Sequence, residues 1–202
     1  KYDNKEILDY LNSQDQRAQG LKDQFRRTII NALEKGEFVF RGSRRPVKSY
    51  AEKLREAANK KLTEVAKLVF DKYHYADINV PGADVEKLLK FRDIKAVPPG
   101  LNHYDLIKSG GKIDLSVLSI QSIKEYIDQT GYAEGKSILE KFANAPYGWS
   151  KDTTRYLVSL MFLASTIKLR ISGADIKVIS ETSIQALKNV NGFNKTGISL
   201  YE

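Results

Sequence analysis

The sequence predicts a mainly helical α+β protein. Apolar residues recur at helical spacing along most of its 202 residues, whereas strand-like alternation is limited to stretches near 37–48 and 166–179. Between residues 119 and 179 the predicted order is helix, helix, turn, helix and two-stranded hairpin. This order is typical of a winged helix. We therefore expect a helical N-terminal half with a small β-hairpin, followed by a winged-helix-like C-terminal half.

The start of the chain is predicted to be helical. A weak apolar pattern covers residues 4–11, and a clearer one covers 21–33. Lys35 and Gly36 close the second pattern as a basic last turn and a C-terminal cap. The polar residues 12–20 fit either a continuous exposed helix or a break between two helices.

A β-hairpin with a basic tip is predicted at residues 37–48. Arg41, Arg44 and Arg45 surround Gly42 and form the most concentrated positive charge in the sequence. Such a tip would either contact phosphate groups or be a solvated turn.

A long helix is predicted from Ser49 to about Tyr73, because apolar residues mark one face over roughly six turns. We expect it to be the main packing element of the N-terminal half. A short helix is expected over 83–91. Gly110 to Lys112 mark the expected boundary between two regions, which are residues 1–112 and 113–202.

The C-terminal half is predicted to hold three helices and a wing. The third helix begins after Ser150, a natural N-cap, and its apolar face is wide enough that the helix should be largely buried. The wing strands are expected on either side of a turn at 172–175. The tail after Val190 is rich in Asn and Gly, and we expect it to be peripheral.

An aromatic turn joins the second and third of these helices. Pro146 cannot continue the preceding helix, Gly148 permits backbone conformations closed to other residues, and Tyr147 and Trp149 can fill the space between helices. We interpret Pro146 to Trp149 as a structural corner. The alternative is an aromatic pair that binds a partner.

Composition limits the class of protein. There is no cysteine, so disulfides, thiol chemistry and cysteine-bound zinc are excluded. No apolar run could span a bilayer and no signal peptide is evident, so we expect a soluble, cytoplasmic protein without a membrane partner. Lys and Arg outnumber Asp and Glu by 33 to 25, giving a formal net charge of +8. This charge fits either a soluble surface or a nucleic-acid surface. The chain also looks cut from a longer one.

No residue pattern predicts catalysis or a cofactor. Residues 131–137, GYAEGKS, resemble a phosphate-binding loop, but three residues separate the glycines where that motif needs four. We interpret Gly131 as a helix cap and Gly135 as the residue before the next helix. With two histidines and no paired metal-ligand spacing, no metal site is expected.

One family resemblance rests on the aromatic turn and its neighbours. The chain resembles a region of the large P-loop ATPases of BREX-type phage-defence systems, the BrxC/PglY group. The residues concerned are Gly135 to Phe142, Pro146 to Trp149, Leu157 to Leu160, Ile167 to Leu169, and upstream Gly36 to Arg41 and Gly111 to Asp114. In that family the nucleotide site lies in another segment, and this chain has no Walker motif. The resemblance therefore implies a non-catalytic piece of a defence ATPase.

Two functions follow from these observations. The first is an interaction or scaffolding segment whose partners are other domains of the parent ATPase or subunits of the defence complex. The second is a DNA-binding winged helix, in which the third helix enters the major groove. Its candidate contacts with DNA are Arg41, Arg44, Arg45, Lys151, Arg155, Lys168, Arg170 and Lys177.

Overall fold

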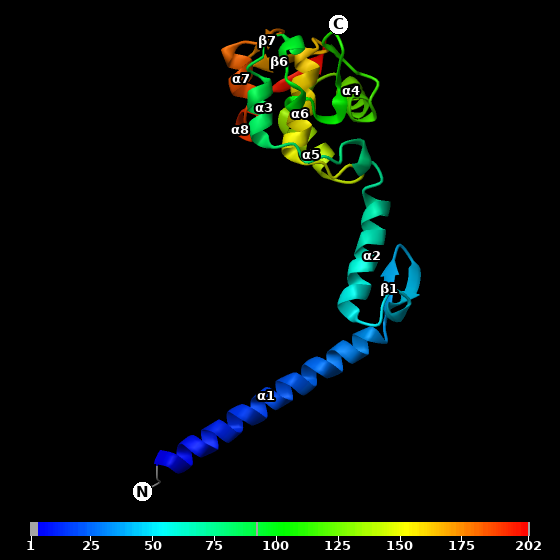
Figure 1. The fold of residues 1–202 in the computed structure, drawn as a ribbon, viewed down its shortest axis with the longest axis vertical. Coiled ribbons are helices and arrows are strands. Elements are labelled where there is room, and N and C mark those ends of the chain that lie inside the picture. Colours follow the sequence, from blue (N-terminus) through cyan, green and yellow to red (C-terminus); the bar gives the residue numbers. More distant parts are fainter. Residues whose placement is uncertain (1–3, 92, 202) are drawn as a thin grey trace. The chain divides into compact units, whose positions relative to one another are not determined.

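The computed structural model describes residues 4–91 and 93–201 (Figure 1). Contacts divide the chain into two compact units, residues 1–68 and 69–202. The predicted division at 112/113 differs from this one. Val80, Val85, Leu88 and Leu106 lie before residue 112 but belong to the same buried cluster as residues of the C-terminal helices. Residues 69–112 are therefore part of the second unit.

The first unit contains a long helix and a hairpin. Helix α1 (Asn4–Glu34) is continuous, so the polar stretch 12–20 is helical rather than a break. Strands β1 (Glu37–Phe40) and β2 (Ser43–Pro46) pair antiparallel around Arg41 and Gly42. Both turn residues have positive φ, 49° and 80°, as a two-residue hairpin with right-handed twist requires. The predicted hairpin is confirmed.

Helix α2 (Leu54–Val69) is shorter than predicted and buries little. Only Ala57 and Lys61 are buried in it, and Leu62 is 65% exposed. Its expected role as the main packing element of the N-terminal half is therefore wrong. The side of α2 that contacts the rest of the first unit carries Ala57 and Lys61 and is not the predicted apolar face, since Leu62 and Ala66 of that face are exposed.

The second unit begins with short elements that precede the winged helix. They are the 3₁₀ helix η2 (Tyr73–Tyr75), α3 (Gly82–Leu88), the 3₁₀ helices η3 (Ile94–Ala96), η4 (Pro99–Leu101) and η5 (His103–Asp105), and the paired strands β3 (Ile107–Lys108) and β4 (Lys112–Ile113). The predicted helix at 83–91 thus exists but ends three residues earlier. Val85 and Leu88 of α3 are fully buried, which fixes this segment to the core.

The C-terminal part confirms the predicted helix order and wing. Its elements are α4 (Leu118–Thr130), β5 (Ala133–Glu134), α5 (Gly135–Ala143), α6 (Lys151–Leu163), β6 (Ile167–Ile171), β7 (Ala174–Ile176), α7 (Glu181–Leu187), α8 (Val190–Asn194) and β8 (Gly197–Leu200). The turn of the β6–β7 wing is tighter than expected: Ser172 and Gly173 form it, with φ of 50° and 84°. Asp175 therefore lies within β7.

The prediction of a peripheral tail after Val190 is wrong. Strand β8 pairs antiparallel with both β5 and β6, so the sheet order is β5-β8-β6-β7 and the tail supplies an inner strand. Phe193 and Ile198 are fully buried. The tail is closely packed, because a Cβ on Gly192 would lie 2.7 Å from the Gln185 carbonyl oxygen. On the other side of this contact, a Cβ on Gly135 of α5 would overlap the carbonyl oxygen of Phe193.

Replacing Gly135 by alanine should strongly destabilise the second unit. The added carbon would clash with backbone rather than with a movable side chain, so we expect a loss of at least about 2 kcal/mol of unfolding free energy. Urea unfolding followed by the fluorescence of Trp149, the single tryptophan, measures it. Gly100→Ala is the control, because its Cβ meets nothing within 4 Å. Equal stability of both variants would contradict the packing seen at α8.

Candidate functional site

The aromatic turn is a closed corner rather than an open site. Tyr147 and Trp149 are both buried. The Trp149 ring stacks on Phe142 of α5 with centroids 4.9 Å apart and planes 9° apart, and the Tyr147 ring lies 4.6 Å from the same phenyl ring. The Trp149 amide donates to the Phe142 carbonyl at 2.8 Å. Neither ring therefore offers a surface to a partner.

The corner is also held by residues that precede the winged helix. The Lys72 amide donates to the Pro146 carbonyl at 3.0 Å, and the Trp149 indole Nε1 donates to the Lys72 carbonyl at 3.4 Å. Gly148 has a φ of 69°, and a Cβ there would lie 2.7 Å from Phe70 Cδ1. These contacts tie α5 and α6 to residues 70–72, which fixes where α6 begins.

Helix α6 occupies the position of the DNA-reading helix in a helix-turn-helix, yet it is buried. Every residue from Thr153 to Phe162 is inaccessible to solvent or nearly so. Helices α3, α4, α5 and α8 all pack against it (Figure 1). A recognition helix must present side chains to base edges in the major groove. In α6 only the first two residues and the last have side chains that reach the solvent.

The polar residues at the start of α6 are used inside the protein. The Thr153 hydroxyl donates to the Ile78 carbonyl at 2.9 Å and accepts from the Val80 amide at 3.1 Å. The Thr154 hydroxyl donates to the Ser150 carbonyl. The Tyr156 hydroxyl donates to the Leu101 carbonyl at 2.6 Å. Two separate segments, at residues 78–80 and at Leu101, are thereby attached to one helix.

Arg155 is a structural residue, which corrects its assignment as a DNA contact. Its guanidinium is 3% exposed and donates to the Leu187 carbonyl from Nε at 3.2 Å and from Nη2 at 2.9 Å. Nη1 forms an ion pair with Asp152. Burial lowers the pKa of Arg155, and the Asp152 carboxylate opposes that shift. All this hydrogen bonding is internal, so the side chain has no free face for a phosphate.

Of the other predicted basic contacts of the second unit, Lys151, Arg170 and Lys177 are exposed and Lys168 is half-buried. Lys151 lies at the first position of α6, and the wing begins after its last. In the wing, Lys168 and Arg170 both pair with Asp175, at 3.3 and 3.0 Å. The bond from Lys168 and the charge of Arg170 hold the pKa of Asp175 below its ordinary value.

Lys177 follows the wing, and its ammonium lies 4.9 Å from the centre of the Tyr201 ring. The wing therefore gathers Lys168, Arg170 and Lys177, but one carboxylate already neutralises part of their charge. Sequence reasoning identified these cations and missed Asp175, because the expected turn included it.

The three arginines of the hairpin tip belong to the first unit. All are exposed. The Arg41 guanidinium lies 5.2 Å from the centre of the Phe40 ring. Arg44 and Arg45 are neighbours on β2 and so point to opposite faces of the hairpin. They do not form a single phosphate-binding cluster.

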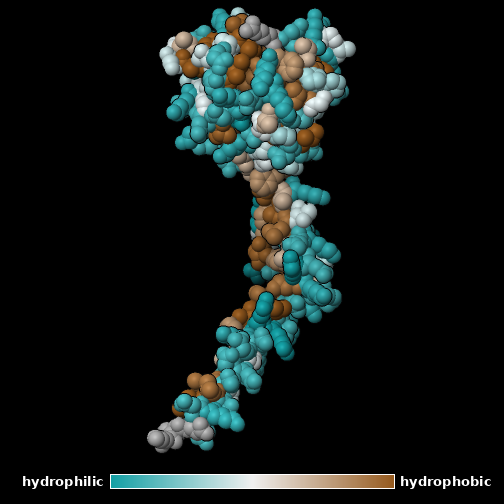
Figure 2. All heavy atoms as spheres, turned by 60° about the vertical axis from the view of Figure 1, so that its left-hand side comes forward, coloured by the Kyte–Doolittle hydropathy of each residue, from teal (hydrophilic) through white to brown (hydrophobic). Residues whose placement is uncertain are grey.

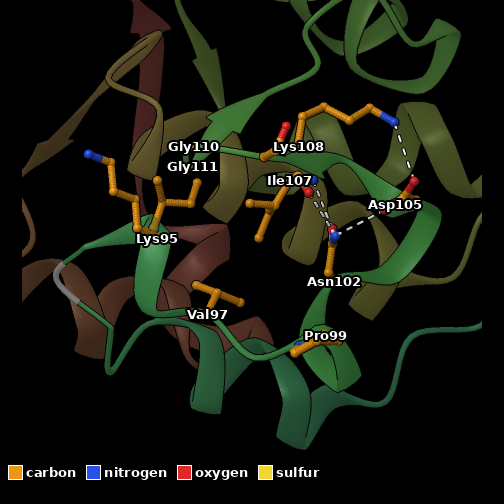
Figure 3. A pocket seen from close by; sticks show the side chains of 11 residues that line it. Lys95, Val97, Pro99, Asn102, Asp105, Ile107, Lys108, Gly110 and Gly111 are labelled. Atoms are coloured by element: carbon orange, nitrogen blue, oxygen red, sulfur yellow. Dashed lines mark hydrogen bonds and ion pairs between the residues drawn. The ribbon is translucent and has the colours of Figure 1, made fainter.

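A hollow beside the β3–β4 hairpin is organised by its own loop (Figure 3). The Asn102 side chain accepts from the Ile107 amide at 2.8 Å and donates to the Ile107 carbonyl at 2.9 Å. It also donates to Asp105, which pairs with Lys108. These bonds shape the loop and leave no converging set of catalytic groups.

The segment that resembles a phosphate-binding loop has a different role. Gly131 has a φ of 66° and ends α4. The Gly135 amide, which begins α5, donates to the Thr196 carbonyl at 2.8 Å. A phosphate at a helix N-terminus needs such amides free, and here β8 and α8 cover this one.

Three helices, an aromatic turn before the third and an antiparallel wing define a winged helix-turn-helix domain, here with a buried third helix. Residues 109–200 match the family described as the winged helix-turn-helix domain of the BREX ATP-binding protein BrxC. This region is therefore BrxC-like. No curated protein and no solved structure matches the chain. Within the described residues, no helix combines the length and apolar character needed to cross a membrane.

Removing the Arg155 side chain should destabilise the protein. Arg155→Ala leaves the Leu187 carbonyl without its donors and Asp152 without its cation, so we expect a loss of about 2 kcal/mol or more. Lys151→Ala, which removes an exposed cation from the same helix, should stay within about 0.5 kcal/mol of the parent. Urea unfolding distinguishes the two variants. Comparable effects of both would show that the Arg155 bonds contribute no net stability.

Two glycine substitutions separate the free-energy cost of steric crowding at the aromatic corner from the cost of backbone strain. Gly131→Ala and Gly148→Ala both place a side chain at positive φ, which costs about 1–2 kcal/mol, but only Gly148 faces a close neighbour. We expect Gly148→Ala to lower the unfolding free energy by about 1 kcal/mol more than Gly131→Ala. A second substitution, Phe70→Ala, should reduce this excess. A Gly148→Ala variant no less stable than Gly131→Ala would refute the close contact.

Proposed function

We propose that this chain is a non-catalytic interaction segment of a BREX phage-defence ATPase in the cytoplasm. Its winged helix would act as a rigid body that positions other domains of the parent chain or other subunits of the defence complex. The observation that carries the proposal is the burial of α6, which removes the usual DNA-reading surface. The match of residues 109–200 to the BrxC domain supports the choice of parent.

Hydrolysis of ATP is assigned to another segment of the parent. The polar groups of this chain that are candidates for binding a nucleotide already form internal hydrogen bonds. Arg155 bonds to Leu187, Gly135 to Thr196, and Asn102 to Ile107. The resemblance to defence ATPases includes no Walker motif within this sequence. The proposed role is therefore structural support for chemistry performed elsewhere.

A second candidate is backbone-level DNA binding without base reading. The exposed Arg170 and Lys177 and the half-buried Lys168 around the wing favour it, because phosphate contacts need only accessible positive charge. Such binding would not involve α6. It would also have to compete with the bonds from Lys168 and Arg170 to Asp175.

Binding to a random-sequence DNA duplex separates the two candidates. We expect no saturable change in fluorescence anisotropy with the 202-residue chain at about 50 mM salt and micromolar protein. Saturable binding that weakens steeply with salt, and that Arg170→Ala or Lys177→Ala reduces, would establish the DNA candidate instead. Lys124→Ala is a control, since this exposed cation lies on α4, outside the wing.

A further inference from the structure

Helix α1 carries large apolar side chains that the other described residues of the first unit leave exposed. Its 31 residues include none that is buried. Nine of its large apolar side chains are exposed, and Figure 2 shows apolar groups between hydrophilic ones along this part of the chain. They are Ile7, Leu8, Tyr10, Leu11, Leu21, Phe25, Ile29, Ile30 and Leu33. Helices in proteins gain most of their stability by packing their apolar side chains against other elements, so we expect α1 to pack against a partner.

Four of these nine residues, Ile7, Leu11, Leu21 and Phe25, have the spacing of a coiled coil. Positions separated alternately by four and three residues form one seam along the helix. The seam residues are Ile7, Leu11, Gln14, Ala18, Leu21, Phe25, Thr28 and Ala32. The Thr28 hydroxyl donates to the Gln24 carbonyl within the helix, so its methyl group is what the seam presents. Leu8 and Ile29 widen the seam on one side.

We propose that α1 packs against α1 of a second copy of this chain in an antiparallel coiled coil. In the register that centres the two helices on each other, every seam layer pairs a large residue with a smaller or unbranched one. Ile7 meets Ala32 of the second copy, Leu11 meets Thr28, and Ala18 meets Leu21. Phe25 meets Gln14. Alternation of large and small side chains fills a helix interface without voids.

A parallel pair would pack less well. Each seam residue would then face its own copy, so Ala18 would meet Ala18 and Gln14 would meet Gln14. Small residues opposite small ones leave gaps. The size pattern of the seam therefore favours the antiparallel orientation.

Charges beside the seam favour the same orientation. In the antiparallel register Asp15 faces Lys22 of the second copy, and Lys22 faces Asp15, so two ion pairs form. Arg17 faces the uncharged Gln24. In a parallel pair Arg17 would face Lys22, and two like-charged contacts would result. The partner is therefore chosen by complementarity of both size and charge.

The first test is the mass of the 202-residue chain. We expect a dimer by light scattering or sedimentation between about 1 and 100 μM. Leu21→Asp should raise the dissociation constant by at least about 100-fold, because a dimer buries this leucine twice. Ile30→Asp is the matched control on the face opposite the seam and should leave the dimer intact. Helical content from circular dichroism shows whether the variants stay folded.

The orientation has its own test, because Lys22→Asp acts in opposite directions in the two arrangements. In the antiparallel dimer it places Asp15 against an aspartate and should weaken association by roughly 3- to 10-fold. In a parallel dimer it would pair Arg17 with an aspartate and strengthen association. The double change Asp15→Lys with Lys22→Asp should restore the parent affinity.

Disulfide trapping reports the register directly, since the chain has no cysteine of its own. A mixture of Ile7→Cys and Ala32→Cys chains should oxidise to the mixed dimer. In a parallel pair these positions lie about 37 Å apart and only like chains would link. A chain that stays monomeric at 100 μM, an unchanged dimer with Leu21→Asp, or disulfides only between like chains would each overturn the proposal.

Discussion

The burial of α6 is the constraint on which the second unit depends. Ten consecutive residues of one helix are hidden, so its surroundings must supply apolar contacts on all sides and partners for its polar groups. The Ser159 hydroxyl is an exception, since it is buried without a hydrogen-bond partner among the described residues. Four helices supply the contacts. Thr153, Arg155 and Tyr156 reach the backbone at Ile78, Leu187 and Leu101. Residues far apart in the sequence are thereby assembled around a single axis.

The aromatic corner sets the direction of that axis. Phe142, Tyr147 and Trp149 form one ring cluster, and the bonds of Trp149 and Pro146 to Lys72 attach it to the beginning of the unit. A corner with this much packing leaves little room for α6 to tilt or slide. The rigid body proposed for the defence ATPase follows from these contacts, since a domain that positions others must keep its own shape.

The distribution of charge explains why the total charge is a poor guide to function here. A net charge of +8 is compatible with a nucleic-acid surface. Arg155, which lies on the helix expected to read DNA, is buried and bonds inside the protein. In the wing, Lys168 and Arg170 both form ion pairs with Asp175. In the first unit, Asp15 and Lys22 acquire a role only when a second α1 is placed beside them. Each charge must therefore be judged by its neighbours.

The sequence by itself determined the local elements. Helical spacing, the Ser150 cap, the glycines of the hairpin turns and the Pro146 corner act within a few residues, so α1 to α6, the β1–β2 and β6–β7 hairpins and the aromatic turn could be predicted. Helices α7 and α8 and the β3–β4 hairpin were not predicted. Tertiary structure alone decided which surfaces meet. Strand β8 pairs with β5 across 65 residues, as Ala133 and Ile198 show, and α3 covers α6 from a similar distance. An apolar pattern specifies that a face is buried but not what covers it, because burial is non-directional.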